Sequence, residues 1–515
     1  MNVSSPRRYL SVWLRRLATD RILRGRAAAP ADLPLAIVGE IKNAHRLTAL
    51  NDAAAALGLK VGTALADARA MYPGLAVEAA DPAADRLLLG AIADWCDRFT
   101  PLVGLDPPDG IILDVTGCAH LFGGESDLCR DLMRRLAIQG FRSRVAVADT
   151  VGCASAVARY GTPAAVPSGG VREILLPLPL AALRIASDLV ALLAEAGLRK
   201  IADVIALPRA PLAARFGAEF VRRLDQAFGR EDEPITPRLP VPAYMAERRF
   251  ADPIALEADV LGIIEHLGGE LSRLLQARGE GARRLQVALF RADGKVHRIE
   301  VGTGEPVRDA ARVRRLFAER LAAVGDACDP GFGFDVIRLS ALATERLDPV
   351  QTGLARDSGE AELSHLVDRL SARFGERRVQ RLIPQNTHIP ELAVAAVPAQ
   401  AKSARFESYA VEQDSLGPVR PIRLFEWPEA IEAIAAVPDG PPVRFRWRRV
   451  LHEVTAAEGP ERIAMEWWRD DKGNALTRDY FRVESREGVR VWLYREGLYG
   501  REETQPRWFL HGLFA

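Results

Sequence analysis

Lysine is scarce in this chain of 515 residues, with six lysines against 63 arginines. The formal net charge is only +1, so bulk electrostatics does not indicate a nucleic-acid-binding protein. The abundance of arginine and alanine is explained most simply by a GC-rich genome. A cluster of arginines in this sequence therefore has to be weighed against an ordinary solvated helix face before it is interpreted as a DNA site.

Cysteine clusters and long apolar runs are absent from the sequence. No CxxC pair occurs, so no zinc site is predicted. No uncharged apolar run of about 18 residues occurs either, so no membrane span is predicted. The first ten residues lack the apolar core of a signal peptide. We expect a soluble, nucleoid-associated protein of the reducing cytoplasm, with free buried thiols at Cys96, Cys118, Cys129, Cys153 and Cys328.

Acidic residues are missing from the first predicted strand. Residues 7–17 have the pattern of a short apolar strand that leads into a helix, and no Asp or Glu precedes Asp20. Predicted strands and helices then alternate through the first third of the chain, as in an α/β or α+β sheet domain. Short amphipathic helices follow from Leu175 to Arg230, and four prolines within residues 231–243 predict a linker.

A separate small domain can be recognised after this linker from its pattern alone. A strand near Ala246–Phe250 precedes a helix at Glu257–Arg278, and the Asp293-Gly294 turn predicts a hairpin between the next two strands. A helix at Ala310–Val324 and a strand at Phe334–Ala341 complete the order β-α-β-β-α-β. This order indicates a small sheet with helices on one face.

The C-terminal part of the chain changes character. Residues 346–418 are predicted to be a linker, in which His388 has no second His or Cys nearby and is expected to be structural. Six of the eight tryptophans follow position 420, and stretches such as VRFRWRRVL and RVWLYRE predict antiparallel strands. We expect a mostly-β module over residues 419–515, with the majority of these tryptophans in its core.

Three segments together carry a resemblance to a known family. They are LNDAAAALGLKVGTALADARAMYPGL (50–75), DWCDRFTPLVGLDPPDGIILDVTGCAHLFGG (94–124) and FRSRVAVADTVGCASAVARYG (141–161). They resemble the Y-family translesion DNA polymerases of the UmuC/DinB-like superfamily. The closer resemblance is to a catalytically degenerate branch found in bacterial damage-inducible mutagenesis cassettes, and it covers nearly the whole chain.

The resemblance implies a multi-domain α+β fold, namely the polymerase right hand followed by the mostly-β module. The palm would consist of residues 7–25 and 80–165, and the fingers of residues 26–79. The thumb would then be residues 166–235, and the little finger residues 245–345, which agrees with the small domain recognised from its pattern.

The first metal-binding segment of the family is altered in this chain. In active relatives, palm carboxylates hold two divalent cations that activate the attacking oxygen and neutralise the triphosphate. The Asp-x-Asp of the opening strand falls on Trp13 and Arg15, and an arginine repels a dication. The alternative is a misaligned N-terminus with Asp20 as the ligand, although Asp20 lies within the predicted helix.

The second metal-binding segment, an Asp-Glu pair, is ambiguous because the loop is longer here. The aspartate corresponds to either Asp106 or Asp109, and the glutamate is then lost to Pro107 or Gly110. Asp114 of the LDVT motif is expected to be a structural strand-end residue. No metal or other cofactor is therefore expected, and Mg²⁺ would be needed only if the chain were an active polymerase.

Nucleotide-binding positions are altered as well. The Tyr and Arg of the fingers that contact the triphosphate in active relatives fall on Asp52 and Ala55, and the palm Lys falls on Ser155. An acid that faces a triphosphate is unfavourable. These concordant losses imply a polymerase fold without polymerisation.

The resemblance implies that a chain with this fold can still bind primer–template DNA without catalysing polymerisation. Little-finger sheets of this family lie along DNA and contact mainly its backbone, which is sequence-independent. The thumb segment 185–197 lacks a Gly in the expected helix-hairpin-helix turn, so affinity should be modest and salt-sensitive. The hairpin residues expected to bind DNA, or alternatively to form a solvated sheet face, are Arg283, Arg284, Arg291, Lys295 and Arg298.

The strongest partner signal is the segment DPVQTGLARD (348–357), placed where bacterial translesion polymerases carry a sliding-clamp peptide. Gln351 would hydrogen-bond in the clamp pocket and Leu354 would fill its apolar subsite. Ala355 stands where a larger apolar residue is usual, which implies weaker binding.

Three hypotheses follow from these observations. In the favoured one, the chain is a non-catalytic scaffold that binds DNA, the clamp, an error-prone replicative-type polymerase α subunit and a RecA-like accessory protein. The second is an active low-fidelity translesion polymerase, and the third is a generic DNA-binding module without a clamp link.

Overall fold

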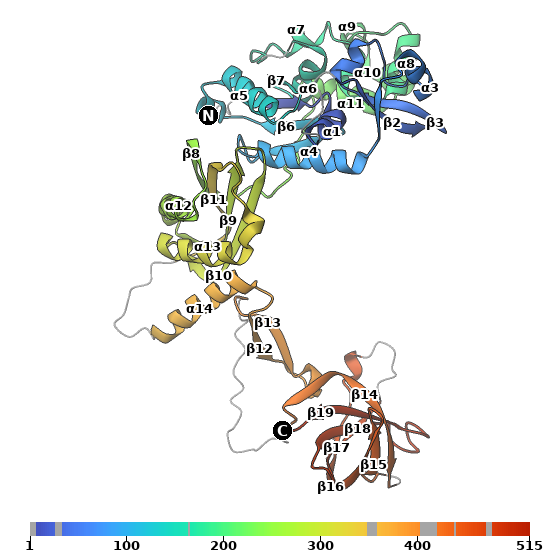
Figure 1. Cartoon of the computed structure of the whole chain (residues 1–515), viewed down its shortest axis with the longest axis vertical. Coiled ribbons are helices and arrows are strands. Elements are labelled where there is room, and N and C mark those ends of the chain that lie inside the picture. Colours follow the sequence, from blue (N-terminus) through green and yellow to red (C-terminus); the bar gives the residue numbers. More distant parts are fainter. Residues whose placement is uncertain are drawn as a thin grey trace. The chain divides into compact units, whose positions relative to one another are not determined.

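The computed structural model describes residues 7–25, 33–162, 165–347, 358–401, 420–436, 439–469 and 476–515. The chain divides into two compact units, residues 1–362 and residues 363–515 (Figure 1). The fold class is α+β, as predicted, because sheet-and-helix domains precede a mostly-β C-terminal region. Among the described residues, no helix is long and apolar enough to cross a membrane.

The palm sheet has the strand order β5-β6-β1-β7, in which β1 (Tyr9–Trp13) pairs antiparallel with both β6 and β7. Side chains alternate between the two faces of a strand. Leu10 and Val12 therefore pack with α4 and α5, whereas Tyr9 packs with α6. The elements of this layer are β5 (Val103–Asp106), β6 (Gly110–Asp114), β7 (Arg144–Ala148), α1 (Leu17–Arg24), α4 (Pro82–Cys96), α5 (Glu125–Ile138) and α6 (Val151–Tyr160).

The fingers form a small three-stranded sheet with the order β3-β2-β4. Asn51 caps the short helix α2, since its side chain accepts the backbone N–H of Ala54 and thereby ends β3 at the helix start. The elements are β2 (Leu35–Ile41), β3 (Ala44–Leu50), α2 (Asp52–Ala56), α3 (Leu65–Met71) and β4 (Ala76–Ala79).

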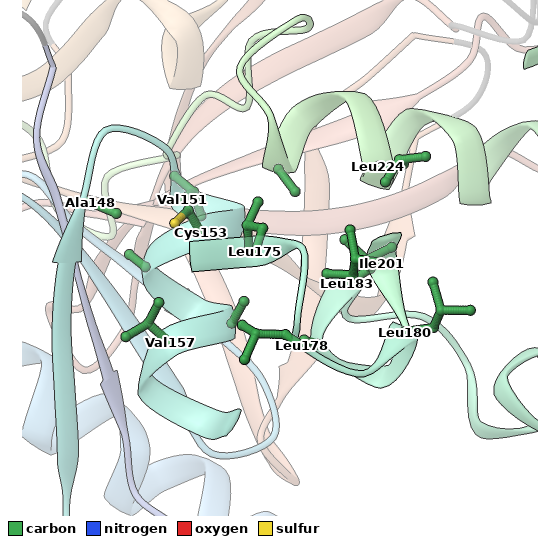
Figure 2. Packing of buried hydrophobic residues seen from close by; sticks show 14 of the residues in the cluster. Ala148, Val151, Cys153, Val157, Leu175, Leu178, Leu180, Leu183, Ile201 and Leu224 are labelled. Carbon is green, nitrogen blue, oxygen red and sulfur yellow. The ribbon is translucent and has the colours of Figure 1, made fainter. Parts of the chain in front are cut away.

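The thumb consists of short helices that continue the core on the α6 side of the palm sheet. Val157 of α6 and Leu175, Leu183 and Leu224 of the thumb belong to one buried cluster, which Figure 2 shows from close by. The helices are α7 (Val171–Leu175), α8 (Ser187–Glu195), α9 (Ile201–Ile205), α10 (Arg209–Phe216) and α11 (Ala218–Ala227).

The little finger has the predicted order β-α-β-β-α-β, and this prediction is confirmed. Its sheet has the order β10-β9-β11-β8, and the hairpin between β9 and β10 turns at Gly294, which has a positive φ of 95°. The elements are β8 (Tyr244–Ile254), α12 (Glu257–Ala277), β9 (Glu280–Arg291), β10 (Val296–Val307), α13 (Ala310–Val324) and β11 (Phe334–Arg346).

The stretch expected to be a linker contains regular structure, so that expectation was wrong for most of residues 358–398. It contains the helix α14 (Ser358–Phe374) and an antiparallel hairpin of β12 (Gln380–Pro384) and β13 (Val394–Pro398). The residues of the hairpin alternate between exposed and partly buried positions.

The C-terminal module is a closed six-stranded barrel, which confirms the predicted β-rich region. Among its described tryptophans, Trp492 and Trp508 are buried, but Trp427 is 80% and Trp468 is 60% exposed. The expectation of a mainly core role was therefore wrong for the exposed pair. The strands are β14 (Arg423–Ala435), β15 (Pro442–Trp447), β16 (Val450–Ile463), β17 (Arg478–Ser485), β18 (Arg490–Glu496) and β19 (Arg507–Leu513).

The segment before β13 packs against this barrel. Thr387 donates to Glu466 at 2.7 Å, the Nε2 atom of His388 lies 2.6 Å from the carbonyl oxygen of Ala464, and Arg478 of β17 donates to Glu391 at 2.6 Å. Within the barrel, the hydroxyl of Tyr480 lies 2.8 Å from the Nδ1 atom of His511, whose side chain is fully buried.

Candidate active-site remnant in the palm

The end of β1 lies beside the turn that connects β5 and β6. Trp13 is the register partner of Gly110, and the indole N–H of Trp13 donates to Asp109 Oδ2 at 2.8 Å. Trp13, which the sequence comparison placed at a metal-binding position of the family, thus donates a hydrogen bond to one of the two candidate acids.

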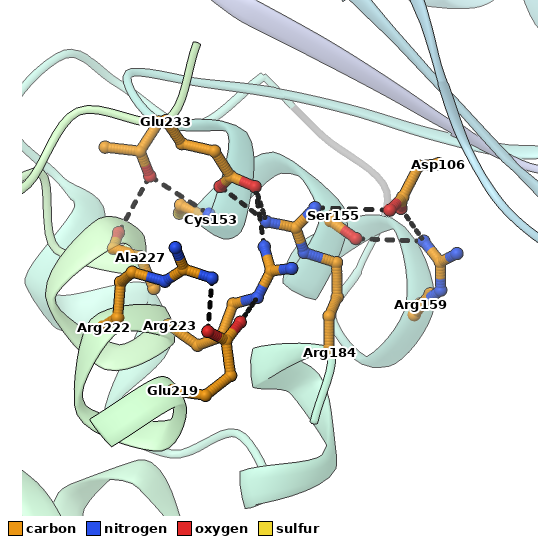
Figure 3. Close-up of polar contacts among 11 residues, drawn as sticks. Asp106, Cys153, Ser155, Arg159, Arg184, Glu219, Arg222, Arg223, Ala227 and Glu233 are labelled. Carbon is orange, nitrogen blue, oxygen red and sulfur yellow. Dashed lines mark hydrogen bonds and ion pairs between the residues drawn. The ribbon is translucent and has the colours of Figure 1, made fainter. Parts of the chain in front are cut away.

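Arg159 of α6 lies between the two acids that the sequence left as alternatives. Its guanidinium donates to Asp109 Oδ1 at 2.9 Å and forms an ion pair of 3.4 Å with Asp106 Oδ2. The same side chain donates to the Oγ atom of Ser155 at 2.9 Å, one helical turn earlier (Figure 3). The structure therefore brings Asp106 and Asp109 together around one arginine.

Gly110 is one of the two residues predicted to replace the family's glutamate, and there is no room for a side chain at this position. A Cβ atom built there would lie 2.7 Å from the backbone oxygen of Asp106 and 3.0 Å from a nitrogen of Arg159. Both distances are shorter than ordinary van der Waals contacts. The backbone oxygen of Asp106 and the guanidinium of Arg159 fill the space beside Gly110, so no side chain fits there.

Asp106 is also connected to the thumb. Arg184, which follows the thumb turn Leu180–Leu183, lies 3.3 Å from Asp106 Oδ1 and 2.5 Å from Glu233, and Arg223 of α11 donates to Glu233 at 3.0 Å (Figure 3). Burial lowers the pKa of Arg184, but its ion pairs with Glu233 and Asp106 outweigh burial and leave this pKa above its usual value. Arg184 is therefore charged.

Two other acids of the palm have structural partners. Asp20 lies in α1 and is buried, with its carboxylate accepting the backbone N–H of Arg142 at 2.8 Å just before β7. Burial raises the pKa of Asp20 to about 6. Asp20 thus has a structural partner in this structure, which favours a structural role over the alternative role as a metal ligand. Asp114 accepts the backbone N–H of Thr116 at 3.0 Å, as expected of a strand-end residue.

The altered fingers residue Asp52 joins the fingers to the palm. Its carboxylate accepts hydrogen bonds from Arg15, from Arg16 at 3.0 Å and from Arg142 at 2.8 Å. Burial raises the pKa of Asp52, but the hydrogen bonds from Arg16 and Arg15 outweigh burial and hold this pKa below its usual value. Beside this cluster lies a cleft of about 580 Å³. Ala55, one turn further along α2, contributes no charge.

The described residues contain no group of three or more His, Cys, Asp or Glu side chains placed to hold a metal ion. The polar atoms around Asp106 and Asp109 come instead from Trp13, Arg159 and Arg184.

The little-finger residues expected to bind DNA differ in their availability. Arg284 and Lys295 have exposed side chains, although Arg284 donates to Glu300 at 2.7 Å. Arg283 is largely covered and donates to the backbone oxygen of Gly304 at 2.7 Å.

Arg291 and Arg298 form ion pairs within this structure, and their role in DNA binding stays a prediction. Arg291 is buried and forms ion pairs with Asp293 at 2.5 Å and Asp329 at 3.4 Å. Arg298 reaches the end of α4, where it donates to Asp97 at 3.2 Å. Carboxylates that are near in sequence or in space pair with both arginines. A count of arginines in the sequence cannot show such pairing.

Buried charges also join the little finger to the end of α4. Arg338 of β11 donates to Glu247 and to the backbone oxygen of Asp97 at 2.8 and 2.9 Å. Arg98 donates to Asp335 of β11 at 2.7 Å, and both side chains are buried. Buried pairs of this kind strongly favour one geometry, because breaking either pair would leave an uncompensated charge.

The sequence alone did not single out Arg159 or Arg184. Arg159 lies four residues after Ser155 and therefore on the same face of α6, but no helix was predicted there from the sequence. Arg184 follows an irregular turn, and nothing local connects it with Asp106. Gln351 and Leu354, the predicted clamp-binding residues, lie outside the described residues.

Two family models match separate segments of this chain. The model of the impB/mucB/samB family matches residues 26–159, and that of the impB/mucB/samB family C-terminal domain matches residues 242–355. Among solved structures, DinB from Sulfolobus solfataricus gives a TM-score of 0.37 at 17% identity, covering 66% of this chain and all of that chain. An insertion ternary complex of Dbh DNA polymerase gives 0.38 at 15% identity, covering 67% and 100%.

The fold and the matched domains define a polymerase-like protein of the UmuC/DinB superfamily. Protein ImuB from two Caulobacter vibrioides strains (NA1000/CB15N and CB15) is 43% identical over 470 residues, covering 89% of this chain and 100% of each relative. The chain belongs to the ImuB family. It is a polymerase-like, DNA-damage-related protein.

Proposed function

We propose that this chain is a non-catalytic scaffold in translesion synthesis. The observation that carries the proposal is Arg159, whose guanidinium occupies the space between Asp106 and Asp109. A guanidinium has a fixed charge and opposes a divalent cation at the same carboxylates. With Trp13 bonded to Asp109 and no room for a glutamate at Gly110, these residues do not fit a two-metal centre.

The fingers support the same proposal. A polymerase needs positive charge toward the triphosphate, yet Asp52 presents a carboxylate whose charge is already used by Arg15, Arg16 and Arg142. The arginines that could bind phosphate thus hold the fingers against the palm. As a scaffold, the chain would bind damaged primer–template DNA and the sliding clamp. It would recruit an error-prone polymerase α subunit together with the RecA-like protein ImuA.

Primer extension by the purified full chain tests the absence of catalysis. With Mg²⁺ or Mn²⁺ and all four dNTPs we expect no incorporation above a protein-free reaction. Incorporation that is abolished by Asp109→Ala or Asp106→Ala, and retained by the control Asp127→Ala on the exposed face of α5, would establish the active-polymerase alternative. Calorimetry with Mn²⁺ gives a second readout, because the scaffold should release no heat of specific binding at these acids.

A clamp-binding assay separates the scaffold from a generic DNA-binding module. The double substitution Gln351→Ala with Leu354→Ala should weaken clamp binding by about tenfold or more, since the polar anchor and the apolar anchor are both removed. The control Asp348→Ala with Thr352→Ala alters the same segment and should leave binding unchanged. Equal binding by both double variants would remove the clamp from the proposal.

A further inference from the structure

The helix-bearing side of the little finger contains a cleft of about 580 Å³. It lies between the start of α12, the end of α13 and the loop that leads into β11. Its floor is apolar and includes the buried residues Val260, Leu289 and Phe334. We call it the Phe332 cleft, after the residue at its edge. Clefts with an apolar floor are the usual form of binding sites.

Two large apolar side chains are exposed at the edge of this cleft. Phe332 is 81% exposed and lies between the lining residues Pro330 and Phe334, and Leu256 is 69% exposed beside the lining residue Glu257. Single exposed apolar residues are ordinary, but both of these adjoin, along the chain, residues that line an apolar cleft, and we call the two side chains and the cleft floor the apolar patch. Covering this patch would remove apolar surface from water, which favours association.

The loop that presents Phe332 is fixed in place on both sides. Gly331 and Gly333 have positive φ values of 50° and 89°. A Cβ atom at Gly331 would lie 2.2 Å from a nitrogen of Arg291, and one at Gly333 would lie 2.8 Å from the Cβ atom of Pro253. The backbone therefore packs closely against its neighbours, and Phe332 is held outward before any partner binds, which lowers the ordering cost of binding.

The charge at the rim identifies the kind of partner. The charged residues that line the cleft are Glu257, Asp326 and Asp329, all acidic. Asp329 is partly neutralised by Arg291 at 3.4 Å, whereas no ion pair joins Glu257 or Asp326 to another described residue. An acidic rim repels a phosphate backbone and attracts Lys and Arg side chains. The cleft is thus unsuited to DNA and suited to a basic protein segment.

We propose that the Phe332 cleft docks a segment of another protein in which an apolar side chain is flanked by Lys or Arg. The apolar side chain would enter the cleft against Leu289 and Phe334, Phe332 would cover it, and the basic residues would face Glu257 and Asp326. This docking surface goes beyond the scaffold function, because no partner surface on the described chain is otherwise assigned.

Fluorescence anisotropy of two labelled synthetic peptides with the full chain tests the proposal. Both peptides carry a central Leu-Phe pair, flanked by four Lys and Arg residues in one and by four Glu residues in the other. We expect saturable binding of the basic peptide and at least about tenfold weaker binding of the acidic peptide. The variants Phe332→Ser and Asp326→Lys should each weaken the basic peptide by about tenfold. Both positions are exposed, so both variants should fold.

Matched controls place the same chemical changes elsewhere. Leu87→Ser removes an exposed apolar side chain from α4, and Asp127→Lys reverses an exposed charge on α5, so neither should alter binding. Cys328 lines the cleft and supplies a local readout. In a Cys118→Ser background, the bound basic peptide should slow alkylation of Cys328 by maleimide.

Three results would each overturn the proposal. They are the absence of basic-peptide binding at peptide concentrations up to about 1 mM, equal weakening by the control variants, and unchanged alkylation of Cys328 at peptide saturation. Binding of a duplex DNA that is lost in Phe332→Ser would also overturn it, because the cleft would then serve nucleic acid.

Discussion

The acids around Arg159 in the palm and the histidine inside the C-terminal barrel are both shielded from water, but the two regions stabilise these ionisable side chains differently. In the palm, Asp106 and Asp109 are compensated by Arg159 and Arg184. In the barrel, the Nε2 atom of His511 is buried without a hydrogen-bond partner among the described residues, although a carboxylate oxygen of Glu391 lies 4.0 Å away.

This difference shows how the palm and the barrel each stabilise their buried ionisable groups. The palm keeps its charges and neutralises them with opposite charge, so its stability depends on the arginines. The barrel keeps its histidine neutral, because burial lowers the pKa of His511 to about 4 despite the opposing charge of Glu391. The palm should therefore respond mainly to loss of a guanidinium, and the barrel mainly to acid.

The largest expected effect comes from removing the palm counter-charge. Arg159→Met leaves Asp106 and Asp109 close together with less compensation, and should lower the stability of the palm by about 3 kcal/mol. Hydrogen exchange of the β1 amides measures this loss locally. The control Arg134→Met removes an exposed ion pair with Asp131 and should change stability by less than about 0.5 kcal/mol. Equal effects of the two variants would mean that Arg159 does not compensate the acids.

Acid should destabilise the barrel next most strongly. Because the pKa of His511 is about 4 in the folded state and about 6.5 when unfolded, the unfolded chain binds more protons between these values. The contribution of His511 is complete above pH 6.5 and should be lost as pH falls through this window, by about 2 to 3 kcal/mol. Urea unfolding followed by tryptophan fluorescence measures it, since most tryptophans lie in this module.

The variant His511→Phe serves as the control for this titration. Phenylalanine can keep the stacking against Tyr480 and Trp492 but cannot accept a proton. The pH dependence between 6.5 and 4 should therefore be smaller in the variant. A slope identical to that of the unsubstituted chain would show that other groups cause it.

Asp20, in the unit of residues 1–362, should give stability a pH dependence of the opposite sign. It is buried like His511, and its carboxyl has a pKa of about 6 in the folded state against about 3.9 when unfolded. The folded state thus binds more protons in this window, and the stabilising contribution is present below pH 3.9 and lost as pH rises through 6. Relative to the unsubstituted chain, Asp20→Asn should gain about 2 kcal/mol between pH 4 and pH 7. Hydrogen exchange at β7 checks this gain.

The smallest effect concerns the hydrogen bond between Tyr480 and His511. Tyr480→Phe should cost about 1 kcal/mol, since it leaves the Nδ1 atom of His511 without this partner at 2.8 Å. Urea unfolding measures the loss, and Tyr499→Phe at an exposed position is the control. A cost of zero would indicate that water satisfies the imidazole.

Local patterns predicted much of the fold. The hairpin turn at Asp293-Gly294 and the helix at 257–278 are encoded by neighbouring residues, and β9, β10 and α12 occur where they were expected. The region 358–398 was misread, because its hairpin is stabilised by contacts to residues far along the chain, such as those of Thr387 and His388.

The candidate site shows the same division. Its sequence predicted the loss of carboxylates at Trp13, Arg15 and Gly110, since residue identities alone decide which ligands are missing. It did not predict that Arg159 and Arg184 would contact Asp106, because these contacts depend on how α6 and the thumb pack on the palm sheet. It also overestimated the number of free arginines, as Arg291 and Arg298 show.

The sequence by itself determined which residue types stand at Trp13, Arg15 and Gly110 and the order of the strands and helices in the small domain, because side-chain identity and local periodicity are carried by neighbouring residues. Only the tertiary structure decided which side chains contact the nearby acids. Arginine reaches far and pairs with whichever carboxylate folding brings near, so Arg159 came to lie between Asp106 and Asp109, and Asp52 came to hold three arginines. Pairings across such sequence distances are decided by packing.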